Sequence, residues 1–433
     1  MSTTENDRSA IPPAAAGSEF RSGWRMLVAA SIGIAFGASP IPFNSIGAFT
    51  VPLTEEFGWG RGDVQFAILG YTIAVVIAVP IIGALADRFG VRRVALGTLI
   101  AFGLGFAALS LTPASLFGFY TIWIITGLLG GGSTPVTWTR GVNAWFERRR
   151  GMALAIALMG TGITAAFLPR LTTWLIAEFG WRTAFATISL LPLAVALPIA
   201  VAWFREPTVE RSGKTRAPRE QTGVTVRQAL ANYRFWVIAV ALFAIAMGVG
   251  GLITNFLPLL TDRGFSTADA AWTSGAIGIS LIIGRLGVGY LLDRVWAPLV
   301  TFPLLVMPAI ACAILMQDQV GQVSAIAAAC MIGAAAGAET DLVAYLAVRY
   351  FGLRHYGTIY GLQYAVFAMA SGIAPWAFGR VFDQFGTYDP VLTVFSVGLV
   401  IGAAALFTLG RYPDFPVKPD YSPVDNISDK CGT

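Results

Sequence analysis

Charged residues are scarce in this chain. Asp, Glu, Lys and Arg make up only 12% of its 433 residues, whereas soluble domains carry roughly 25%. The chain also contains one histidine and three cysteines, two of which, Cys312 and Cys330, lie in apolar runs. These residues indicate no disulfide framework, metal site or cofactor site. The shortage of charge excludes an ordinary soluble globular protein.

Long apolar runs separate the few charges. About 20 predominantly apolar residues are enough to cross a bilayer as an α-helix. We therefore predict an all-α, multi-pass membrane protein with twelve membrane-spanning helices. Their approximate ranges are 26–50, 64–86, 94–112, 118–141, 152–176, 183–203, 235–259, 269–292, 299–317, 322–347, 357–380 and 389–410.

Lysine and arginine are distributed unevenly among the predicted loops. If the N-terminus is cytoplasmic, 22 of the 29 basic residues fall in cytoplasmic segments, three fall within spans and four fall in external loops. Because cytoplasmic loops of membrane proteins are enriched in Lys and Arg, we predict that both termini are cytoplasmic. Short loops and an Ala- and Gly-rich composition favour a location in the plasma membrane, the inner membrane of a bacterium. The net charge of +5 then follows from topology, and no nucleic-acid binding is expected.

An internal repeat divides the chain into two halves. GALADRFG begins at Gly83 and GYLLDRVW begins at Gly289, 206 residues later, and Pro52 and Pro258 correspond at the same offset. A parallel repeat of this kind places the substrate site between the halves, near the bilayer midplane. The predicted segments are a cytoplasmic tail 1–25, a six-helix bundle 26–203, a cytoplasmic linker 204–234, a second six-helix bundle 235–411 and a cytoplasmic tail 412–433.

The repeated segment also resembles a known signature. GALADRFGVRR, from Gly83 to Arg93, consists of Gly, three residues, Asp-Arg, one residue, Gly, one residue and two basic residues. It is similar to the signature between the second and third spans of the major facilitator superfamily. FNSIGAFTVPLTEEFGWGR from Phe43 and GRLGVGYLLDR from Gly284 resemble the monocarboxylate-porter and oxalate–formate-exchanger branch of that family. The resemblance implies the major facilitator fold and secondary active transport by alternating access.

The resemblance further implies a charged gating network at the cytoplasmic helix ends, which stabilises the state closed to the cytoplasm. Its members are Asp87, Arg88, Arg92, Arg93, Asp293 and Arg294. The alternative is topological, because basic residues at these positions also hold the loops inside.

Arg285 lies within the predicted eighth span. A charge at bilayer depth costs at least ~2.5–3.5 kcal/mol on insertion scales, so it usually faces a cavity or a partner. The planar guanidinium can bind a carboxylate through two parallel hydrogen bonds. In the resembled branch, an arginine in this context binds the substrate carboxylate. We therefore predict that Arg285 binds an anionic substrate; the alternative is a structural salt bridge with a neighbouring helix.

Two carboxylates, Glu339 and Asp341, lie in the predicted tenth span. The helical rise places Glu339 about 7 Å to the cytoplasmic side of the midplane, which is also the depth estimated for Arg285. A carboxylate facing Arg285 would neutralise it in the empty carrier, and its protonation would release the arginine for substrate. Since residues two apart on a helix differ by about 200°, the two carboxylates cannot both line one cavity. Glu339 is therefore the first candidate for proton coupling and Asp341 the second; a static pair or a gate is the alternative.

Five further residues are candidate substrate contacts: Asn44, Tyr71, Arg170, Asn255 and Gln363. Arg170 could contact the anion or have a structural role, and a lone Asn or Tyr in a span often holds helices together. Animal porters of the resembled branch carry a proton-coupling lysine at the position of Asn44. Its absence here argues against that version of the coupling.

The predicted function is secondary active transport of a small organic anion, a monocarboxylate, in symport with a proton. An exporter of drugs or metabolites and an anion exchanger are the alternatives. No nucleophile elbow, zinc-ligand spacing or phosphate-binding loop indicates an enzyme, and no cofactor or metal is predicted. The expected partners are the anion, the proton and the lipid bilayer, and the protein is expected to act as a monomer.

The basic asymmetry of the loops generates a topological prediction. Single cysteines placed between Arg205 and Arg234 should not react with a membrane-impermeant thiol reagent added to intact cells, and should react once the cells are permeabilised. A cysteine at Arg182, in a predicted external loop, is the control and should react in intact cells. Labelling of the linker from outside would reverse the predicted orientation.

Overall fold

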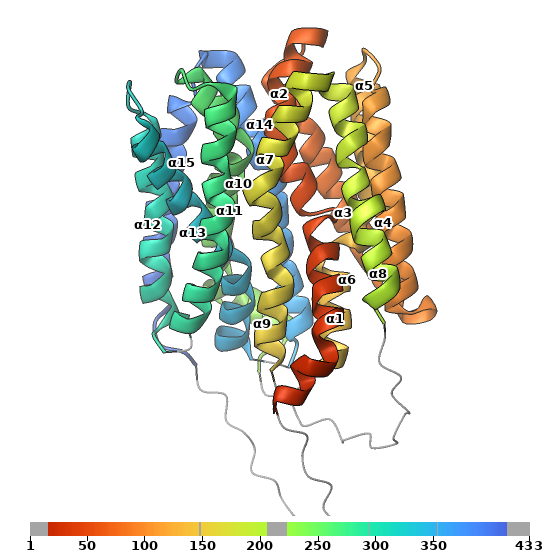
Figure 1. The fold of residues 1–433 in the computed structure, drawn as a ribbon. Coiled ribbons are helices and arrows are strands. Elements are labelled where there is room, and N and C mark those ends of the chain that lie inside the picture. Colours follow the sequence, from red (N-terminus) through yellow and green to blue (C-terminus); the bar gives the residue numbers. More distant parts are fainter. Residues whose placement is uncertain (1–15, 147–148, 206–222, 293, 353, 414–433) are drawn as a thin grey trace, which may run out of the picture.

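The protein is a bundle of long, roughly parallel helices (Figure 1). The structure, a computed structural model, describes residues 16–146, 149–205, 223–292, 294–352 and 354–413. The helices of the first half are α1 (Ala16–Ala35), α2 (Pro40–Phe57), α3 (Arg61–Phe89), α4 (Val91–Ala108), α5 (Leu116–Gly130), α6 (Pro135–Trp145), α7 (Arg150–Ile188) and α8 (Leu197–Trp203). Those of the second half are α9 (Val226–Ala231), α10 (Tyr233–Asp262), α11 (Thr267–Leu292), α12 (Ala297–Leu315), α13 (Gln322–Phe351), α14 (Tyr356–Phe385) and α15 (Asp389–Ala405). Four short helical segments, η1 (Leu109–Leu111), η2 (Gly131–Ser133), η3 (Leu191–Ala196) and η4 (Leu406–Leu409), extend or join them.

These helices account for twelve crossings of a membrane. In the described residues, eleven continuous helical stretches are long and apolar enough to span a bilayer, and the first of them joins α1 to α2. The long helix α7 is broken at Gly180, whose backbone is non-helical at φ 77° and ψ 163°. Residues after Gly180 therefore form a separate crossing with η3 and α8. The all-α, twelve-helix prediction is confirmed, although α1 begins earlier than the predicted first span because hydropathy detects only its apolar part.

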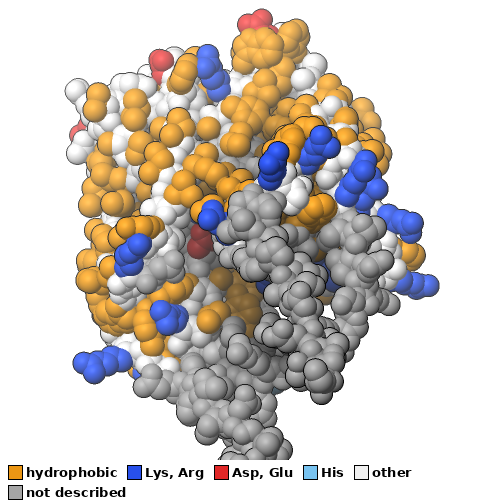
Figure 2. Space-filling view, turned by 60° about the horizontal axis from the view of Figure 1, so that its bottom comes forward, with side chains coloured by type: hydrophobic (Ala, Val, Ile, Leu, Met, Phe, Trp, Pro, Cys, Tyr) orange, Lys and Arg blue, Asp and Glu red, His pale blue; other side chains and the backbone are white. Residues whose placement is uncertain are grey.

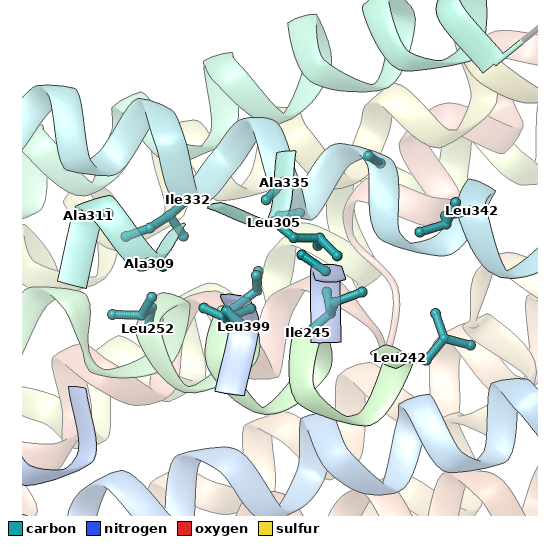
Figure 3. Close-up of a cluster of buried hydrophobic side chains, with 14 of the residues drawn as sticks. Leu242, Ile245, Leu252, Leu305, Ala309, Ala311, Ile332, Ala335, Leu342 and Leu399 are labelled. Atoms are coloured by element: carbon teal, nitrogen blue, oxygen red, sulfur yellow. The ribbon is translucent and has the colours of Figure 1, made fainter. Parts of the chain in front are cut away.

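Each half has its own hydrophobic core. The second half is built around buried side chains of α10, α12, α13 and α15, and Figure 3 shows Leu252, Leu305, Ile332 and Leu399 converging from these four helices. The first half contains two clusters drawn from α1 to α8. In a soluble protein, moving a large aliphatic side chain from water into the core stabilises the fold by roughly 1.5–3 kcal/mol. In a bilayer the surroundings are already apolar, so close packing between helices provides the stabilisation instead. The cores make each half a unit that holds its helices in place.

The two halves meet mainly along two helix pairs, α3 with α14 and α7 with α11. At the first contact, a Cβ atom on Gly379 would lie 2.7 Å from the Gly62 nitrogen. At the second, a Cβ atom on Gly275 would lie 2.6 Å from the Ala166 carbonyl oxygen. Only small residues allow helix backbones to approach so closely. The halves therefore touch backbone to backbone.

Polar contacts also join the halves at the end of the bundle that carries Arg61, called here the Arg61 end. The Arg61 guanidinium donates two hydrogen bonds to Asp262, at 2.6 and 2.9 Å, and a third to the Tyr388 hydroxyl at 3.1 Å. Asp383 of α14 accepts hydrogen bonds from the backbone N–H groups of Arg61 and Gly62, both at 2.8 Å. These two N–H groups begin α3, and a carboxylate at a helix N-terminus is favourable. A side chain of the second half thus caps a helix of the first half.

The opposite end, from which the chain leaves α8 and to which it returns before α9, is called the linker end. Glycines there have open surroundings: a Cβ atom on Gly83, Gly287 or Gly361 would meet nothing within 4 Å. Figure 2 turns this end forward and shows a shaded recess near its middle, in which an acidic side chain is visible, with Lys and Arg around it. Among the described residues, an ion pair and a helix cap join the halves at the Arg61 end, whereas no ion pair joins them at the linker end. The halves are therefore held more loosely at the linker end.

This asymmetry leads to a prediction for Asp262→Asn combined with Asp383→Asn. Each change weakens a charged contact between the halves by about 1 kcal/mol. Together they should raise the fraction of molecules whose halves are apart at the Arg61 end by roughly thirtyfold. Spin labels at the exposed positions Glu178 and Asp318 should report longer distances. The control is Glu56→Gln, which breaks the 2.6 Å contact with Arg182 inside the first half and should leave the distances unchanged. Equal responses of both variants would contradict this role of the Arg61 end.

Candidate functional site

Helix α11 lies between α7 of the first half and α13 of its own half. Small residues make both contacts, as shown by Gly275 against Ala166 of α7 and by Gly337 of α13, whose added Cβ would lie 2.8 Å from the Arg285 nitrogen. Close packing on both sides fixes the rotation and height of α11. The side chain of Arg285 is consequently held at the boundary between the halves.

Arg285 is 6% exposed and bonds to both neighbouring helices. Its Nη1 donates to the Leu158 carbonyl oxygen of α7 at 2.8 Å and lies 3.4 Å from the Thr161 hydroxyl. Its Nε donates to the Gly337 carbonyl oxygen of α13 at 3.2 Å. In this state the guanidinium therefore links the first half to the second.

Both carboxylates of α13 interact electrostatically with Arg285. The nearer one is Asp341, whose Oδ2 lies 3.6 Å from Arg285 Nε, and whose side chain is 36% exposed. Glu339 presents a buried Oε2 with no hydrogen-bond partner among the described residues. The sequence estimate puts Glu339 at the depth of Arg285, but the ion-pair distance belongs to Asp341. Helical rise gives depth and does not fix which side chain faces α11.

Three tyrosines of α14, two of which interact electrostatically with these carboxylates, were missed from the sequence. Tyr356, Tyr360 and Tyr364 stack in sequence, with ring centroids 5.5 and 5.9 Å apart. Tyr360 interacts electrostatically with Asp341, and Tyr364 with Glu339. Their spacing of four residues, which aligns side chains on one helix face, was the signal that could have revealed them.

Three of the predicted substrate contacts instead bond within or between helices. The Asn44 amide donates to the Pro40 carbonyl oxygen at 2.8 Å, one turn earlier in α2. The Tyr71 hydroxyl donates to the Ala38 carbonyl oxygen, and its buried ring packs edge-on against Trp123. Gln363 donates to the Phe235 carbonyl oxygen of α10 at 2.9 Å. The Tyr71 and Gln363 bonds join separate segments, as the alternative for such residues expects, whereas the Asn44 bond lies within α2. Substrate contact by these three residues stays a prediction.

Asn255 and Arg170 bridge the halves away from Arg285. Asn255 and Gln65 exchange amide hydrogen bonds of 3.0 and 2.7 Å, and both side chains are fully buried. Arg170 of α7 is exposed and lies over the Trp272 ring of α11, 4.0 Å from its centroid. The structure does not bring either residue to the Arg285 cluster, and Gln65 was not singled out by the sequence.

The predicted gating residues lie at the linker end. Asp87 forms an ion pair with Arg140, which belongs to α6 of the same half. Arg88 lies 5.2 Å from the Phe89 ring centroid, Arg92 donates to the Val201 carbonyl oxygen at 2.6 Å and Arg93 is exposed. Arg294 lies over Tyr290, 3.6 Å from its ring centroid. Asp293 lies outside the described residues.

Comparison with known proteins finds a matching family model and related transporters. The family model described as Major Facilitator Superfamily matches residues 26–375. Monocarboxylate transporter 13 of Bos taurus is 26% identical over 435 residues, covering 95% of each chain. The 3-(3-hydroxy-phenyl)propionate transporter of Escherichia coli K12 is 25% identical over 393 residues, covering 89% of this chain and 93% of that one.

Among solved structures, a bacterial homolog of the human lysosomal transporter Spinster, in an inward-facing and occupied conformation, has the same fold. Its TM-score is 0.68 at 17% identity, and the match covers 91% of this chain and 97% of that chain.

Proposed function

We propose that this chain, which belongs to the Major Facilitator Superfamily and is therefore a transporter and not an enzyme, moves a small organic anion together with a proton. The observation that supports the proposal is the cluster of Arg285, Glu339 and Asp341 at the boundary between the halves. One guanidinium and two carboxylates are an unusual content for the interior of a membrane protein, where ionisable groups mark substrate and proton pathways.

The charges of this cluster couple the anion to the proton. With both carboxylates ionised, negative charges outnumber the positive one, and an entering anion is repelled strongly because little water screens the site. Protonation of one carboxylate makes the cluster neutral, and the guanidinium can then exchange its 3.6 Å contact with Asp341 for a bidentate pair with the substrate. The anion therefore enters only after a proton, and both leave together.

The arrangement of the halves supplies the alternating access. We assign the linker end to the cytoplasm, as the basic residues of the loops suggest, and the loosely joined state to the inward-facing conformation. Transport to or from the outside then requires the Arg61–Asp262 and Asp383 contacts to break and the Gln65–Asn255 pair to separate.

The relatives support an acid as the cargo. One is named a monocarboxylate transporter and another a transporter of a phenylpropionate. The names share a carboxylate, which is the group that a buried arginine recognises best. We infer a monocarboxylate because the cluster supplies a single guanidinium, and because Arg170 lies elsewhere, over Trp272.

Replacing Arg285 tests the substrate proposal. Arg285→Lys keeps the charge but loses the planar fork, which should cost about 1.5–3 kcal/mol and weaken the apparent affinity roughly ten- to hundredfold; Arg285→Ala should be worse. Affinity is measured by thermal stabilisation of the purified protein with mono-, di- and tricarboxylates, aromatic acids and their amides. Arg170→Lys is the matched control and should bind like the unaltered protein. A neutral or cationic ligand that binds equally well without Arg285 would refute the proposal and favour an exporter.

Replacing Glu339 tests the coupling. Glu339→Gln removes one negative charge permanently, so the anion should bind without a proton, and accumulation driven by a pH gradient should disappear. Exchange of substrate across vesicles at equal pH should persist, because it needs no net proton movement. Glu55→Gln, on the exposed surface of α2, is the control. If Glu339→Gln vesicles still concentrate substrate with only a proton gradient, Glu339 is not the coupling group and Asp341→Asn is tested next.

A further inference from the structure

Glu339, the carboxylate that carries the proton in the proposed coupling, is half-buried. Its Oε2 is fully buried and has no hydrogen-bond partner among the described residues. The titratable groups that interact electrostatically with it are Arg285 of α11 and Tyr364 of α14. Asp341 lies two residues along α13, about 200° around that helix. Helix α12 contains no Asp, Glu, His, Lys, Arg or Tyr, and those of α10 lie only at its ends. Among these neighbours only Tyr364 carries a hydroxyl, which can both accept and donate a proton.

The tyrosines of α14 begin at the linker end and continue inward along one face of the helix. Tyr356 is the first residue of the helix, and Tyr364, two turns deeper, interacts with Glu339. Because Tyr360 is stacked between the other two rings, with interplanar angles of 23° and 26°, its faces are occupied. The stack therefore exposes ring edges and hydroxyl groups to its surroundings.

The three hydroxyls are unpaired and accessible. None of them makes a hydrogen bond within the described residues, and none is among the fully buried, unpartnered side-chain atoms. Each accessible hydroxyl offers one donor and two acceptor sites, so water can connect them.

We propose that Tyr356, Tyr360 and Tyr364 form a hydroxyl relay, bridged by water, that conducts protons between Glu339 and the aqueous phase at the linker end. The proposal rests on the proton-coupled function above. When a proton leaves, the Glu339 carboxyl gives its proton to the Tyr364 side of the relay while the Tyr356 side gives one to bulk water. Each hydroxyl donates one proton and accepts another, so Glu339 becomes a carboxylate and no tyrosinate remains.

Tyrosine-to-phenylalanine variants test the relay because they keep the stacked rings and remove only the hydroxyls. The measurement follows the infrared carbonyl band of protonated Glu339 in purified full-length protein after a pH jump, with the band identified by its loss in Glu339→Gln. No substrate is needed. In the double variant Tyr360→Phe/Tyr364→Phe, the band should relax at least about tenfold more slowly, a rise of about 1.4 kcal/mol in the barrier. Its final amplitude at each pH should not change, because a relay alters rate and not equilibrium.

Tyr290→Phe is the matched control, since Tyr290 is an exposed tyrosine on α11 outside the stack, and it should relax like the unaltered protein. Unchanged relaxation in the double variant would overturn the relay while leaving proton-coupled transport intact. A shifted amplitude at an unchanged rate would also overturn it, because it would mean that the hydroxyls only tune the charge of Glu339. Absence of the Glu339 band at every pH would overturn the relay together with Glu339 as the coupling group.

Discussion

The close approach of helix backbones between the halves is the constraint on which the rest of the structure depends. At α3 with α14 and at α7 with α11, glycines leave no room for side chains between the helices. Two surfaces of this kind can rock about their line of contact, because little interdigitates across it. The same closeness brings Arg285 within hydrogen-bond distance of the Leu158 carbonyl oxygen in the opposite half. This hydrogen bond forms when the halves are together and breaks when they move apart.

The charged cluster makes this geometry useful for transport. A lone arginine between the halves would bind an anion without coupling it to another ion. Asp341 and Glu339 are both half-buried but differ in their surroundings. Asp341 lies 3.6 Å from Arg285, whereas Glu339 has a buried Oε2 with no hydrogen-bond partner among the described residues and interacts electrostatically with Tyr364. Such a difference allows one carboxylate to balance the guanidinium while the other exchanges a proton.

Much of the fold could be predicted from the sequence, because hydropathy, loop charge and the repeat are local or periodic signals. The twelve crossings and the common depth of Arg285 and Glu339 are of this kind. The sequence could not reveal that Gln65 pairs with Asn255, 190 residues away, or that Asp383 caps α3 across 322 residues, since these pairings arise only when the halves assemble. Composition alone also could not show that the donors of Asn44, Tyr71 and Gln363 bond to backbone carbonyl oxygens of their own half.

The reciprocal amide pair of Gln65 and Asn255 has a consequence for the membrane potential. That potential acts on moving charge with roughly 2.3 kcal/mol per elementary charge per 100 mV, and two neutral amides that separate carry no net charge through the field. Separation of this amide pair therefore adds no voltage dependence to opening. Under the proposed stoichiometry, an anion that enters with one proton also adds no net charge to the Arg285 cluster. The transport cycle is then electroneutral, and the chemical gradients of the acid and the proton, not the electrical potential, set its direction.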